Sequence, residues 1–62
     1  MEKTYHKIKA LCKERGTSIR KVEQACGIAN GTIGRWRTRD AKVTTLAKIA
    51  DFFGVTLDEL MQ

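Results

Sequence analysis

Apolar side chains recur at helical spacing along this chain, and glycines separate the repeats. In the first repeat, Tyr5, Ile8, Leu11 and Cys12 follow one another at intervals of one to three residues that place them on one face of a helix. Gly16 comes next, and a glycine just past the last periodic residue is typical of a helix C-terminus. The pattern therefore predicts a first helix over about 5–15.

The second and third repeats are shorter and lie on either side of Gly27. Ser18 is a suitable N-cap for a second helix, which should end at Gly27. The apolar stripe of this helix consists of Ile19, Val22 and Cys26. A third segment, over roughly 30–38, places Ile33 and Trp36 on one side.

Two further helices follow from the C-terminal part of the pattern. Thr44 or Thr45 is the expected N-cap of a fourth helix, which Gly54 ends. Its apolar positions are Leu46, Ile49, Ala50 and Phe53. The stretch Thr56-Leu57-Asp58-Glu59 has the form of a capping box and predicts a short fifth helix, in which Leu57, Leu60 and Met61 are apolar.

The dipeptide Asn30-Gly31 conflicts with this helical pattern, because Asn-Gly is a strong signal for a β-hairpin turn. A hairpin needs apolar and polar residues to alternate on both flanks, and residues 18–27 have the helical period instead. We therefore expect the helical context to override the turn signal, with Asn30 or Ala29 as the N-cap of the third helix. Gly34 then lies in the helix interior, where a glycine costs roughly 1 kcal/mol relative to alanine.

Length and residue types exclude several classes of protein. The 62 residues contain no run of apolar residues long enough for a membrane span and no leader-like start, so we expect a cytoplasmic protein. Cys12 and Cys26 occupy apolar positions of separate helices, which favours reduced core thiols over a disulfide. His6 is the only histidine, and we expect no metal site, no cofactor and no catalytic residues.

The charges are divided unevenly along the chain. Residues 1–42 carry eleven basic and four acidic side chains, a net charge of +7, whereas residues 43–62 carry one basic and three acidic, a net charge of −2. A basic body with an acidic end suggests one face for a polyanion and another that points away from it. A solvated surface with surplus lysine would give the same totals, so charge alone does not decide the function.

The second helix, the glycine and the third helix have the spacing of a helix-turn-helix. Gly27 falls five residues after Val22 and six before Ile33, which allows a sharp corner with both side chains packed beneath it. We expect Trp36 to complete this core. The stretch from Ser18 to Trp36, followed by "TLAKIADFFGVTLDELM", resembles the lambda-repressor-like (Cro/repressor-type, XRE-type) helix-turn-helix DNA-binding domain over about residues 5–61.

The resemblance implies a compact all-α domain of five helices that spans 1–62, with the helix-turn-helix at about 18–38. It also implies a sequence-specific regulator that binds double-stranded DNA and reads the major groove with its third helix. We expect a repressor. The alternative is an antitoxin-like or other protein-interaction module for which DNA binding is secondary, and we expect neither an enzyme nor a small-molecule substrate.

The sequence departs from the family pattern at two positions. The family often has a glutamine near the start of the second helix, where it contacts a DNA phosphate, and this chain has Ile19 there. It usually has an alanine where this chain has Glu23, because the two helices approach closely at that point. We expect the carboxylate of Glu23 either to tilt into solvent or to pair with Arg35 or Arg37.

Candidate base contacts follow from the third helix. On a helical wheel, Arg35 points away from the core formed by Ile33 and Trp36. Its guanidinium can bind guanine O6 and N7, and the amide of Asn30 can bind adenine. By resemblance, the positions that read sequence are Asn30, Gly31, Thr32 and Arg35. A solvated helix charge is the alternative for Arg35.

Two basic groups flank these positions and are candidates for phosphate contacts. One lies at the start of the second helix, where basic side chains oppose the helix dipole but suit a bound phosphate. The other follows the third helix. Together the candidates are Ser18, Arg20, Lys21, Arg37, Arg39 and Lys42. Each could equally be an ordinary surface charge.

Because one such domain covers only a half-site, we expect a homodimer, at least on DNA, and a pseudo-palindromic operator. The candidates for the dimer contact are Phe52, Leu57 and Met61. For Phe52, a position at the edge of the core is the alternative.

Overall fold

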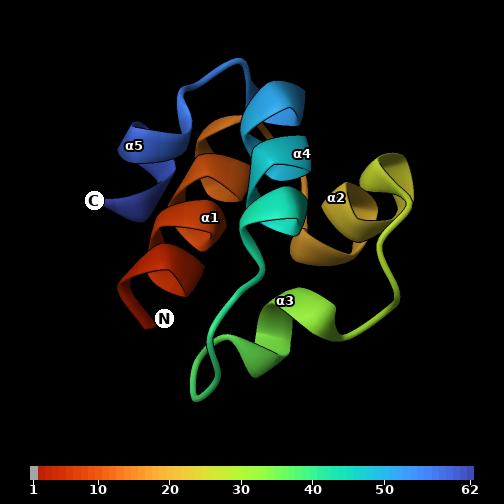
Figure 1. Ribbon diagram of the computed structural model, residues 1–62. Coiled ribbons are helices and arrows are strands. Elements are labelled where there is room, and N and C mark those ends of the chain that lie inside the picture. Colours follow the sequence, from red (N-terminus) through yellow and green to blue (C-terminus); the bar gives the residue numbers. More distant parts are fainter. Residues whose placement is uncertain (1) are drawn as a thin grey trace.

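A computed structural model describes residues 2–62, and in this range it contains five α-helices and no strand (Figure 1). The helices are α1 (Glu2–Glu14), α2 (Ile19–Cys26), α3 (Thr32–Arg35), α4 (Val43–Phe53) and α5 (Leu57–Met61). This confirms the prediction of an all-α protein with five short helices. None of the helices in the described range is long and apolar enough to cross a membrane.

Three of the helices end in the same backbone motif. In each case a glycine with a φ of 67°, 70° or 71° lies one or two residues past the last helical residue, and the next amide donates a hydrogen bond to a carbonyl five residues earlier. At the end of α2, for example, the Ile28 amide donates to the Glu23 carbonyl at 2.8 Å. This arrangement is the Schellman motif, which requires a left-handed residue and therefore favours glycine. It confirms the predicted helix ends at Gly16, Gly27 and Gly54.

The helix starts agree with the sequence at α2 and α5 but not at α4. The side chains of Ser18 and Thr56 each accept a hydrogen bond from an amide of the first turn, at 3.2 Å and 3.1 Å. The prediction that Thr44 or Thr45 caps α4 is wrong, because the N-cap is Lys42, which makes no side-chain cap. The Leu46 amide already donates to the Lys42 carbonyl, so both threonines lie inside the first turn.

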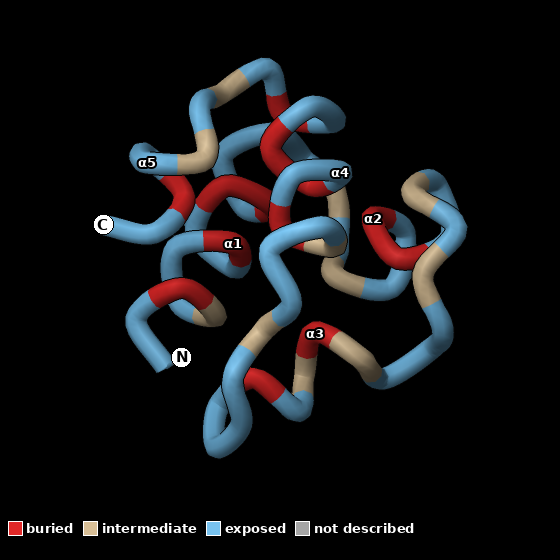
Figure 2. The backbone as a smooth tube through the Cα atoms, viewed as in Figure 1, coloured by how far each residue is buried: buried red, intermediate tan, exposed pale blue. Residues whose placement is uncertain are grey.

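One apolar core joins all five helices. Figure 2 shows that the buried stretches of α1, α2, α3 and α4 face the centre of the molecule. The core consists of Ile8, Leu11, Cys12, Val22, Ile33, Trp36, Leu46, Ile49, Ala50, Phe53 and Leu60. The apolar face predicted for α4 is buried at all four positions, whereas Tyr5 of α1 is only half-buried. α3 packs on α2 and lies at one end of the bundle (Figure 1).

Both cysteines are free thiols, and burial raises the pKa of each. At Cys26 the charge of Lys48 acts against this rise. Because the thiolate is the reactive form, both should react with iodoacetamide at about pH 8 more slowly than a small-molecule thiol. Cys12 is 3 % exposed and Cys26 is half-buried, so we expect Cys26 to be modified first. Mass spectrometry of timed samples measures the order, and earlier modification of Cys12 would contradict it.

Candidate nucleic-acid interface

A tight turn at Asn30-Gly31 leads into α3. The Thr32 amide donates to the Ala29 carbonyl at 3.2 Å, and Gly31 has φ 89° and ψ −5°. No non-glycine residue in the described range has a positive φ, so Asn30 is in an ordinary conformation and the turn is of type II, which needs glycine at this position. Our expectation that the helical context overrides the turn signal was therefore wrong. The turn forms, but it joins two helices rather than two strands.

The helix after this turn is shorter than predicted. α3 covers only Thr32–Arg35 rather than 30–38, and its N-cap is Gly31, so neither Asn30 nor Ala29 serves as the cap. Beyond Arg35 the chain continues in turns, with the amides of Thr38 and Arg39 both donating to the Arg35 carbonyl, at 3.1 Å and 3.0 Å. The expected base-contacting positions therefore lie on a single helical turn and the tight turn before it, not on a longer helix.

Glu23 is buried at the junction of α2 and α3. Only 2 % of the residue is exposed, and its carboxylate accepts a hydrogen bond from the Gly31 amide at 3.1 Å and another from the Ile33 amide at 2.9 Å. The expectation that this side chain enters solvent or pairs with Arg35 or Arg37 was therefore wrong. The first amides of a helix have no partner within the helix, and the N-cap Gly31 has no side chain that could accept their hydrogen bonds. The Glu23 carboxylate accepts two of these hydrogen bonds instead.

The expected base-contacting positions lie at the start and the outer side of α3. Asn30, Gly31 and Arg35 are exposed, and Thr32 is half-buried. Arg35 borders two depressions. One is a cleft of about 440 Å³ between α3, the turn after α2 and the start of α4. The other is lined by Gly31, Gly34, Arg37 and Thr38, with Glu2 of α1. Arg35 therefore lies between two hollows that follow α3.

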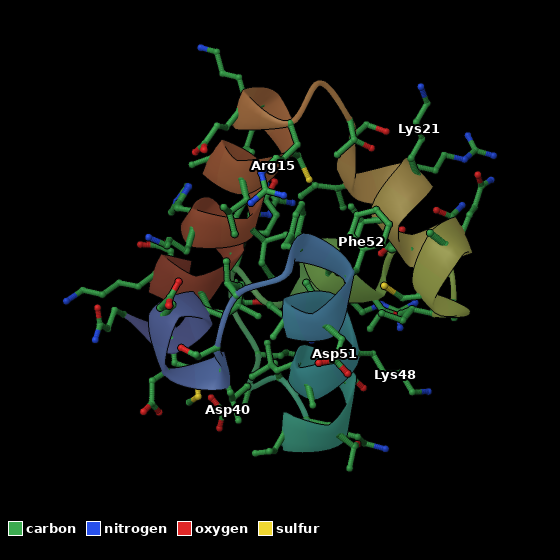
Figure 3. All side chains as sticks on the ribbon, turned by 90° about the horizontal axis from the view of Figure 1, so that it is seen from above. Arg15, Lys21, Asp40, Lys48, Asp51 and Phe52 are labelled. Carbon is green, nitrogen blue, oxygen red and sulfur yellow. The ribbon has the colours of Figure 1, made fainter. Side chains whose placement is uncertain are left out.

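The cleft on the α4 side has a basic lining. Besides Arg35 it contains Arg39, Lys42 and Lys48, and Asp40 is its one acidic residue in the described range. Figure 3 shows Lys48 extending outward from α4. The sequence analysis included Arg39 and Lys42 among the phosphate candidates but missed Lys48. The spacing of Lys42, Thr45 and Lys48, which places them on one side of α4, was the available signal.

The basic groups at the start of α2 and after α3 are in different situations. Arg20 lines a small hollow together with Asn30, which brings these two candidates together. Lys21 extends from α2 away from the rest of the chain (Figure 3). Arg37 is held against the protein, because its Nε donates to the Gly34 carbonyl at 3.2 Å and its guanidinium carbon lies 5.7 Å from the centre of the Tyr5 ring.

The residues considered for a dimer contact differ in exposure. Phe52 of α4 is 45 % exposed and Met61 of α5 is 44 % exposed, whereas Leu57 is half-buried against the core. The Phe52 ring packs edge-on against the Phe53 ring, with 5.1 Å between their centres. Phe52 therefore packs at the edge of the core, and part of its apolar ring remains exposed to solvent.

Comparison with known proteins agrees with this arrangement. A family model described as Helix-turn-helix matches residues 8–60. A search of curated proteins and a search of solved structures found no match. The matched range includes all of α2, α3 and α4 and the turn between α2 and α3. The chain therefore belongs to the helix-turn-helix family of DNA-binding regulators.

Proposed function

We propose that this protein is a sequence-specific transcriptional regulator that binds double-stranded DNA with α3 in the major groove and acts as a repressor. The observation that carries the proposal is the position of Arg35, which is exposed at the end of α3 and lies between two hollows. A helix in the major groove has a sugar-phosphate backbone on each side of it. We propose a repressor because a protein can repress transcription simply by occupying its DNA site.

The roles of the individual side chains follow from this orientation. Arg35 binds guanine through its two parallel donors, and Asn30 and Thr32 reach neighbouring bases. Gly31 contributes no side chain, and its backbone amide already donates a hydrogen bond to the Glu23 carboxylate. The basic residues around the cleft, including Lys48, and those at the start of α2 bind phosphates. These contacts supply affinity and register but little sequence information.

Two copies bind a pseudo-palindromic operator as a dimer. One α3 covers a half-site, and a two-fold pair of domains places its recognition helices about 34–36 Å apart. The candidates for the contact between copies are the partly exposed Phe52 and Met61 and the half-buried Leu57, which packs against the core.

The test is selection of bound sites from a library of random duplexes, followed by titration of the selected site at several salt concentrations. We expect one enriched motif with two related half-sites and an affinity that falls steeply as salt rises, because each neutralised phosphate releases counterions. Binding without any enriched motif would contradict the proposal. That result, with a stable complex between this chain and a co-expressed partner protein, would support the protein-interaction alternative.

Gly34→Ala tests how closely α3 approaches the DNA. Gly34 has no positive φ, and a methyl group added there would meet nothing within 4 Å. We expect the substitution to stabilise the free protein by about 0.5–1 kcal/mol, because alanine loses less conformational freedom in a helix. The methyl group would lie in the hollow beside Arg35, so specific affinity should fall. Thermal unfolding and DNA titration measure the two effects, and a stabilised variant with unchanged affinity would show that α3 does not need the space.

A further inference from the structure

We propose that Glu23 is a positioning residue for DNA reading, which holds the start of α3 in the orientation that presents Arg35 and Asn30. This inference rests on the proposed function. Each carboxylate oxygen of Glu23 accepts one backbone amide, from Gly31 and from Ile33. Ile33 is the second residue of α3, and its amide is one that an N-cap side chain ordinarily satisfies. Glu23 performs this role from the neighbouring helix.

A cap supplied by α2 has a consequence that a cap within α3 would not have. A side chain at position 31 would move together with α3, whereas Glu23 belongs to α2, which ends in its own hydrogen-bonded motif at Gly27. Two hydrogen bonds from backbone amides to one carboxylate therefore restrict how α3 rotates relative to α2. This restriction matters because α3 is only one turn long, and a helix of that length has little stability of its own.

The charge of Glu23 also affects how the start of α3 interacts with DNA. Unpaired amides at a helix start attract phosphates of any sequence. At α3 the carboxylate of Glu23 accepts hydrogen bonds from two of these amides, so they are not available to a phosphate. Glu23 thus favours contacts by the side chains of α3 over contacts by its backbone. Its loss should lower specific binding and leave sequence-independent binding equal or stronger.

The hydrogen bonds can be measured in the free parent protein by NMR. We expect through-bond correlations from the Gly31 and Ile33 amides to the Glu23 carboxyl carbon. In Glu23→Gln the same two amides should exchange with solvent about tenfold faster or more, because a hydrogen bond to a charged group is lost or weakened. The amides of α4 should change much less. If Glu23→Gln does not fold, the correlations in the parent still decide, and their absence would overturn the proposal.

Specificity is measured as the ratio of affinities for the selected duplex and a random duplex. We expect Glu23→Gln to lower this ratio about tenfold, a change that follows from losing one charge-assisted hydrogen bond. General destabilisation lowers both affinities in proportion and leaves the ratio unchanged, so the ratio separates positioning from a merely structural role. Glu14→Gln is the matched control, since it makes the same charge change at an exposed residue of α1 and should leave the ratio unaltered.

The two possible failures are distinguishable. If the parent selects a sequence and Glu23→Gln discriminates equally well, the inference about Glu23 is overturned and the proposed function stands. If the parent selects no sequence at all, the proposed function fails, and the positioning of α3 for DNA reading fails with it.

Discussion

Arg35→Ala should weaken binding to the selected duplex by about ten- to a hundredfold and leave the thermal midpoint nearly unchanged. Arg35 is exposed, and its side chain is not part of the apolar core. A bidentate contact between an arginine and guanine contributes about 1–3 kcal/mol of discrimination, which accounts for most of the expected loss. Removal of one charge beside the phosphates contributes the rest. Competition between the selected duplex and a random duplex measures the loss of specificity directly.

Two control variants separate the parts of this effect. Arg35→Lys keeps the charge but has no planar pair of donors, so it should retain binding to random duplexes and lose most of the specificity. Lys9→Ala removes a charge from an exposed position of α1, outside the proposed interface, and should change both affinities little. If Arg35→Ala binds both duplexes as tightly as the parent, Arg35 does not read the sequence.

Ile33→Ala should remove a large part of the stability of the protein. The side chain of Ile33 is 0 % exposed and lies in the core shared by all five helices. Truncation of a buried isoleucine costs about 2–5 kcal/mol, through lost burial and the cavity left behind. A chain of 62 residues has a free energy of unfolding of only about 3–9 kcal/mol. Urea unfolding followed by circular dichroism should therefore show a much lower midpoint, or a chain that is already unfolded in buffer.

The matched comparison for this variant is Ile33→Val, which removes one methylene and should cost about 0.5–1.5 kcal/mol. Both changes keep the backbone amide that donates to Glu23. A smaller loss of stability in Ile33→Val than in Ile33→Ala therefore measures how the side chain packs, and not the hydrogen bond from the Ile33 amide to Glu23. An unfolding midpoint for Ile33→Ala equal to that of the parent would contradict the placement of Ile33 in the core.

These two variants separate the two sides of one short helix. Ile33 and Arg35 are two residues apart in α3, yet one is fully buried and the other is exposed beside the basic cleft. Loss of the Ile33 side chain should weaken binding because it destabilises the fold, and loss of the Arg35 side chain should reduce specificity in a protein that remains folded. The helical wheel had already separated their sides from sequence alone.

Other features of the site were only partly accessible from sequence. The type II turn at Asn30-Gly31 is a local feature, and its signal was present but was set aside because the flanks were helical. The start of α4 at Val43 was missed because two threonines nearby looked like better caps. At Asn30-Gly31 the turn forms between two helices, and α4 begins without a side-chain cap.

The sequence by itself determined the five helices, their apolar faces, most of their ends and the family. Helix periodicity, glycine-ended helices and side-chain caps all depend on residues within about five positions of one another, so they can be recognised along the chain. Only the tertiary structure decided which donors bind the Glu23 carboxylate and that Lys48 lines the basic cleft. The partners of the Glu23 carboxylate are eight and ten residues away, across a corner whose geometry depends on how α2 and α3 pack. A buried carboxylate must find hydrogen-bond donors, but the sequence does not show which donors the fold will bring within reach.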